Sequence, residues 1–90
     1  MNNAFIFSKK SKYQYDELET GLKARIQNKL SILKTHPDIW SVIERLAELK
    51  NKVYKLRIGQ YRILLEIKTQ ERENTLFQIL EIDHRSRIYR

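Results

Sequence analysis

The stretch VYKLRIGQYRILLEI, residues 53–67, decides the fold that the sequence predicts. Apolar and polar side chains alternate on both sides of Gly59, which is the two-residue period of a half-buried β-strand. A glycine in the first position of a two-residue loop is typical of a type II′ hairpin turn. We therefore expect two antiparallel strands joined by Gly59 and Gln60. In this register Leu56 lies opposite Ile63 and the apolar side chains of both strands share one face, so pattern and pairing agree.

The same register places like charges together on the other face. Arg57 lies directly opposite Arg62, and Lys55 follows on the same face. Like charges opposite each other destabilise an antiparallel pair. A face selected only for solubility would mix signs, but here only Glu66, at the far end, is acidic. A cationic cluster that costs folding energy is a candidate anion site, most naturally for phosphates. The alternative is that these long side chains only cover apolar surface and keep the protein soluble.

Length and composition indicate one globular domain over residues 1–90. The chain is 41% hydrophobic and 32% charged, which is typical of a folded protein rather than a disordered tail. It has no cysteine, so disulfides and thiolate metal sites are excluded. No run approaches the ~20 apolar residues that span a membrane, and residues 1–10 hold too few apolar side chains for the core of a signal peptide. We expect a cytoplasmic protein with no membrane partner.

The net charge of +7 is concentrated in the second half of the chain. Residues 50–90 carry 10 basic and 5 acidic side chains, against 8 and 6 in residues 1–49. This asymmetry indicates a polyanion, an acidic protein, or both as binding partners. Charge alone does not choose between these partners.

The first half of the chain predicts a strand and two helices. AFIF, residues 4–7, is a short apolar strand candidate, and the polar stretch after it is compatible with a helix capped by Ser8 or Ser11. From Gly21 onward apolar residues recur at helical spacing. They are Leu22, Ile26, Leu30 and Leu33. A glycine between two helical stretches predicts a helical hairpin.

The second helix should end at His36 and Pro37, because the residue before a proline disfavours the helical conformation. Residues 37–50 then predict either a further short helix or an ordered loop. After the hairpin, residues 68–74 predict a polar turn, and residues 75–82 are apolar on both faces, as in a strand with two neighbours. The predicted fold is a small α+β domain: an N-terminal strand, a helical hairpin and a three-stranded antiparallel meander, with the helices packed on one face.

The C-terminal stretch HRSRIYR, residues 84–90, adds side chains that suit phosphodiester chemistry. It holds one imidazole, three guanidiniums and one phenol directly after the last strand. His84 or Tyr89 alone would more often be a structural residue. Together beside Arg57 and Arg62, they predict a site for phosphodiester chemistry.

The stretches YKLRIGQYRILLEI and IDHRSRIYR, with FIFSKKSKY and the helix over residues 22–33, resemble the RelE/ParE superfamily of bacterial type II toxins. The resemblance covers almost the whole chain and implies a RelE-like fold. It also implies a toxin neutralised by a cognate acidic antitoxin, with operator DNA bound only through the antitoxin complex. RelE-type members are mRNA interferases that cut messenger RNA in the ribosomal A site, by attack of a 2′-hydroxyl on the adjacent phosphate and without metal. ParE-type members share the fold but inhibit DNA gyrase and lack the nuclease residues.

The resemblance assigns catalytic roles to five residues. Lys55 and Arg62 match basic hairpin positions of the RelE-like nucleases, and His84 stands where several relatives carry histidine. Arg85 matches a basic residue after the last central strand and would assist the leaving group. Tyr89 matches a tyrosine near the C-terminus and would stack on a base or orient the phosphate.

Two further residues, Arg57 and Lys52, are candidate phosphate-binding residues beside them. Arg57 and Arg62 suit the stabilisation of the phosphorane, because a guanidinium stays charged and binds phosphate in a fork. The general base is either His84 or Lys55, and the sequence leaves both alternatives open. We expect no metal and no other cofactor.

The leading hypothesis is therefore a ribosome-dependent mRNA endonuclease that inhibits translation. The runner-up is a ParE-like toxin that inhibits DNA gyrase by protein contact. A third hypothesis is a domain that only pairs with an antitoxin and operator DNA.

Overall fold

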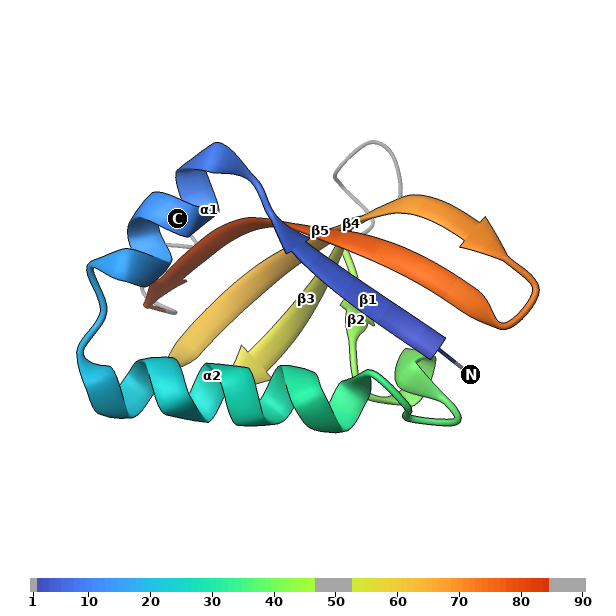
Figure 1. Ribbon diagram of the computed structural model, residues 1–90, viewed down its shortest axis with the longest axis horizontal. Helices are drawn as coiled ribbons and strands as arrows, with labels where there is room; N and C mark the ends of the chain where they lie inside the picture. Colours follow the sequence, from blue (N-terminus) through green and yellow to red (C-terminus); the bar gives the residue numbers. More distant parts are fainter. Residues whose placement is uncertain (1, 47–52, 85–90) are drawn as a thin grey trace.

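A five-stranded sheet with helix α2 along one face forms the centre of the fold (Figure 1). The computed structural model describes residues 2–46 and 53–84. The strand order is β1-β5-β4-β3-β2, in which β1 runs parallel to β5 and the other pairs are antiparallel. The predicted α+β class, N-terminal strand and meander are confirmed. The strands are β1 (Asn2–Phe7), β2 (Glu44–Arg45), β3 (Val53–Ile58), β4 (Tyr61–Glu71) and β5 (Asn74–His84).

Two helices follow β1. α1 (Lys9–Asp16) begins after Ser8, which forms a capping box with Ser11, each side chain accepting a hydrogen bond from the other residue's backbone N–H. Ser8 is therefore the cap among the two predicted candidates. The sequence had suggested that Gly21 connects the two helices. α2 (Thr20–Leu33) already includes Gly21 in its first turn, so the connection lies before this glycine. No helix in the described part of the chain has the length and apolar content to cross a membrane.

The hydrophobic core lies between α2 and the sheet. All four predicted apolar residues of α2 are buried, and they pack in one cluster with side chains from the three central strands. The fully buried members from these strands are Leu56, Ile63, Leu65, Phe77 and Ile79. α1 reaches the same core through Tyr15 and also bonds the edge of β5, where Ser11 Oγ donates to the carbonyl of Ile79 at 2.6 Å.

The segment between α2 and β3 contains a short 3₁₀ helix, Ile39–Ser41, and then strand β2. The sequence left a short helix or a loop open here, and β2 was not predicted. A two-residue strand is too short to show the alternation by which strands are recognised. His36 stabilises the turn before this segment, because its Nδ1 accepts a hydrogen bond from the backbone N–H of Asp38 at 2.9 Å.

Strands β3 and β4 join through the predicted two-residue turn. Gly59 has a φ of +60°, whereas Gln60 keeps a negative φ, which is the pattern of a type II′ turn. The predicted register is confirmed, with Leu56 opposite Ile63. Arg25 of α2 lies against this turn, since a Cβ at Gly59 would be 2.8 Å from Arg25 Nη2. The position needs glycine for its backbone conformation, while the guanidinium above it could move.

We expect Gly59→Ala to lower the free energy of unfolding by about 1–3 kcal/mol, because an L-residue is strained at this φ. The matched control is Gly21→Ala, where the added Cβ meets no atom within 4 Å. In the first turn of a helix this change should stabilise the protein by up to about 1 kcal/mol. Urea denaturation of both variants measures the difference. Equal midpoints would contradict the requirement for glycine in the turn.

Candidate functional site

The face of the sheet opposite α2, called the open face below, carries the predicted cations of the hairpin. Strand pairing places Arg57 of β3, Arg62 of β4 and Asp83 of β5 in one row across this face. Residues directly opposite each other share a face of the sheet. A carboxylate that the sequence prediction did not include therefore stands on the far side of Arg62 from Arg57. The row holds two positive charges and one negative charge.

The sequence had suggested that Arg62 is exposed, but in the structure it is buried. Only 2% of the residue is accessible, whereas Arg57 is exposed. Arg62 lies on β4, the middle strand of the five, while Arg57 lies one strand closer to the edge. A buried guanidinium is costly unless it is paired and hydrogen-bonded. Arg62 Nη1 donates to the carbonyl of Tyr61 at 3.3 Å, and Asp83 is its neighbour on β5.

Lys55 shares the open face with Arg57 and lies next to β2. Its Nζ is 3.3 Å from Oε1 of Glu44, which stands opposite Lys55 in the β2–β3 ladder. The side chain of Lys55 is 12% exposed. The nearby carboxylate offsets part of the ammonium charge, so Arg57 is the more available cation of the two.

His84 lies on the opposite face from the arginines. It pairs with Tyr61 at the end of β5, and the two rings meet edge to face with their centroids 5.6 Å apart. Successive side chains on a strand point to opposite faces, so the sheet separates His84 from Arg62 and Arg57. The expectation that His84 stands beside these arginines is wrong. The sequence pattern ended the strand at residue 82, whereas β5 continues to His84 and thereby sets which face the imidazole takes.

Three predicted site residues, Lys52, Arg85 and Tyr89, lie outside the described residues, and their roles stay predictions. Within residues 2–46 and 53–84, no group of three or more histidine or acidic side chains could hold a metal ion.

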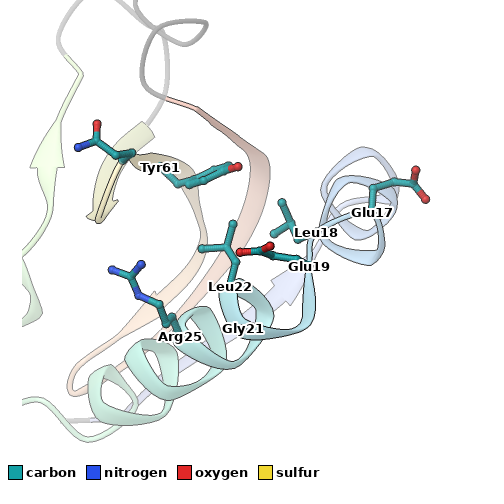
Figure 2. Close-up of a pocket in the computed structure, with 8 residues that line it drawn as sticks. Glu17, Leu18, Glu19, Gly21, Leu22, Arg25 and Tyr61 are labelled. Carbon is teal, nitrogen blue, oxygen red and sulfur yellow. The ribbon is translucent and has the colours of Figure 1, made fainter.

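Arg25 is a residue that sequence reasoning did not single out, and it borders two cavities. The larger, about 570 Å³, lies between the start of α2 and the hairpin turn (Figure 2). Figure 2 shows Glu19 and Tyr61 directed into this space and Glu17 directed away from it. The Glu19 carboxylate makes this cavity a poor phosphate site. The sequence does contain a pattern that could have identified Arg25. It precedes Lys29 by one helical turn, so both cations lie on the same side of the helix, beside the apolar stripe.

Two solved structures share this fold. A chain of the archaeal RelE–RelB complex from Pyrococcus horikoshii OT3 matches with a TM-score of 0.71 and 19% identity, covering 97% of this chain and 99% of that chain. A chain of the toxin–antitoxin complex RelBE2 from Mycobacterium tuberculosis matches with a TM-score of 0.73 and 22% identity, covering 94% and 100%. The fold is therefore that of the RelE-like toxins.

The sequence also matches the family model described as ParE toxin of the type II toxin–antitoxin system parDE, over residues 6–89. The chain belongs to this toxin family, within the RelE/ParE superfamily. The resemblance predicted from the hairpin and the C-terminal stretch is confirmed.

A partial similarity connects the chain with a ribosomal protein. It is 34% identical to small ribosomal subunit protein eS17 of Korarchaeum cryptofilum over a 53-residue alignment that covers 50% of this chain and 76% of that protein. Because this match leaves half of the chain unaccounted for, whereas the toxin family spans nearly all of it, the toxin family describes the fold.

We expect Arg57→Gln to raise the free energy of unfolding by about 0.2–1 kcal/mol, because it removes a like charge opposite Arg62. The control Lys55→Gln removes the same charge two residues away but also loses the contact with Glu44, so it should not stabilise the protein. Urea denaturation at low salt compares the two. Equal losses of stability in both variants would show that the facing arginines do not repel.

Proposed function

We propose that this toxin is an mRNA endonuclease that acts on the ribosome and so stops translation. The observation that carries the proposal is the pair of facing arginines on the open face, with Lys55 beside them. Guanidiniums bind phosphate oxygens and keep their charge, so they are suited to a phosphorane transition state. Membership of a toxin family supports a harmful activity that an antitoxin holds in check.

The proposed reaction is an internal transesterification of RNA. A 2′-hydroxyl attacks the adjacent phosphorus and loses its proton to a base. The new bond from the 2′-oxygen forms while the bond to the 5′-oxygen breaks, and that oxygen receives a proton. The products are a 2′,3′-cyclic phosphate and a 5′-hydroxyl end. Arg57, which is exposed, would bind the non-bridging oxygens, and the buried charge of Arg62 would add to the positive field beneath them.

The geometry bears on the two candidates for the base. Lys55 shares the face of Arg57, whereas His84 lies across the sheet, against Tyr61. Lys55 is thus the better placed of the two for a phosphate bound at the arginines. His84 would serve only a phosphate bound at the end of the sheet, where β5 ends. Arg85 and Tyr89 keep their proposed roles: Arg85 would assist the leaving group, and Tyr89 would stack on a nucleobase or orient the phosphate.

Induction of the protein in bacteria should halt translation and produce transcripts with new 5′-hydroxyl ends. Arg57→Gln should lower the cleavage rate by about 10²–10³-fold, as expected for the loss of one electrostatic stabiliser. The control Lys9→Gln changes an exposed lysine on α1 and should cleave normally. Primer extension on induced transcripts measures the cleavage. Growth arrest with intact transcripts would contradict the nuclease.

The match to the ParE family model favours a second candidate, which is inhibition of DNA gyrase by protein contact. In that case the same induction would leave transcripts intact and raise the DNA-damage response. The cations of the open face would then bind a protein surface and take no part in chemistry.

Under either activity, we propose a cognate acidic antitoxin as the partner. One of the two similar structures is named as a RelE–RelB complex and the other as a toxin–antitoxin complex, and a net charge of +7 attracts an acidic segment. An antitoxin that covers Arg57 would block the proposed phosphate site, and operator DNA would be bound only through the complex. The proposed location is the cytoplasm. Co-expression of a neighbouring reading frame should restore growth, and failure of both adjacent frames would oppose this assignment.

A further inference from the structure

A second cavity, of about 270 Å³, lies where α2 meets the turn end of β3. Helix α2 contributes Arg25, Asn28 and Lys29 to its wall, and the hairpin contributes Arg57 with the two residues that follow it. In the described part of the chain, β2 pairs only with the earlier residues Tyr54 and Lys55. The cavity therefore lies beside β3 beyond its short neighbour, at the border between the helix-covered face and the open face.

The three cations of this cavity have no acidic partner among the described residues. Arg25, Lys29 and Arg57 form no ion pair within residues 2–46 and 53–84, whereas Lys55 on the neighbouring surface is paired with Glu44. Like charges gathered around one space repel, and a ligand of opposite charge relieves that repulsion. The cavity that Arg25 shares with Glu17 and Glu19 differs in this respect, because carboxylates line it.

Arg57 connects this cavity with the open face. It stands opposite Arg62 in the sheet and also lines the cavity, so positive charge continues from the facing arginines around the side of β3 to α2. Arg25 lies against Gly59, so its guanidinium is next to the turn. The side chains described in the cavity wall are cationic, amide or aliphatic, and none is aromatic. Such a wall suits phosphates rather than stacked bases.

We propose that Arg25 and Lys29, together with Arg57, form a subsite for a backbone phosphate of single-stranded RNA, next to the phosphodiester that is cleaved. The choice of RNA rests on the proposed function. A single strand can turn from the open face around β3 onto α2, whereas a stiff duplex cannot follow so short a path. Contacts to phosphates carry no information about the base sequence, so this subsite would add affinity for RNA without sequence preference.

The test compares two double variants with equal loss of charge. Arg25→Gln with Lys29→Gln removes the α2 cations of the subsite, and Lys9→Gln with Lys68→Gln removes two exposed lysines elsewhere. The probe is a short single-stranded RNA with 2′-O-methyl groups, which cannot be cleaved. We expect the subsite variant to bind about tenfold more weakly and its slope of log K against log salt to shrink by up to ~0.7, since the loss of one phosphate contact in a single strand removes ~0.7. The control should keep the wild-type slope.

Four outcomes decide the proposal. Wild-type affinity and slope in the subsite variant, or losses no larger than those of the control, would overturn the subsite. The subsite would also be overturned if the wild-type protein bound no RNA. This holds even if the subsite variant weakened binding to gyrase. The expected losses alongside intact transcripts in the cell would support the subsite and overturn only the nuclease. If the double variant does not fold, Lys29→Gln alone decides in its place, and it should weaken binding and shrink the slope by no more than ~0.7.

Discussion

The positive φ of Gly59 determines the arrangement of both faces of the sheet. Because the loop has two residues, Ile58 pairs with Tyr61, and every further pair of the β3–β4 ladder follows from that first one. A slip of one residue would turn Leu56 towards the open face and expose the core beneath α2. The buried apolar layer and the row of charges behind it are therefore two results of a single constraint. The cationic face cannot be changed by shifting the strand, only by changing its residues.

The order of the strands then decides how each charge is balanced. Arg62, on the middle strand, is buried with Asp83 on one side and Arg57 on the other. Asp83 can offset the charge of one arginine only, so among the described residues a positive charge remains at Arg57, whose side chain is exposed. This is the place that a ligand can reach, and Arg25 and Lys29 enlarge it from the helix side. A positive charge that the described residues do not neutralise is the physical basis for expecting an anionic ligand.

The hairpin could be predicted from the sequence because its information is local: alternation, a two-residue loop and a glycine suited to it. The apolar stripe of α2 and the family resemblance were equally readable. The position of His84 could not be predicted, because the apolar pattern stops before β5 ends and one further residue reverses the face. The burial of Arg62 and the approach of Arg25 to Gly59 depend on how distant parts of the chain pack together, which a single sequence does not show.

The central claim is that Arg57 opposes folding slightly and is retained because it binds phosphate. Thermal melting of wild type and Arg57→Gln, each with and without the uncleavable RNA, tests both parts at once. Without RNA the variant should melt at or above the wild-type temperature. With RNA the order should reverse, because a ligand stabilises the protein that binds it more tightly. A variant that melts lower on its own and gains the same shift from RNA would contradict the account.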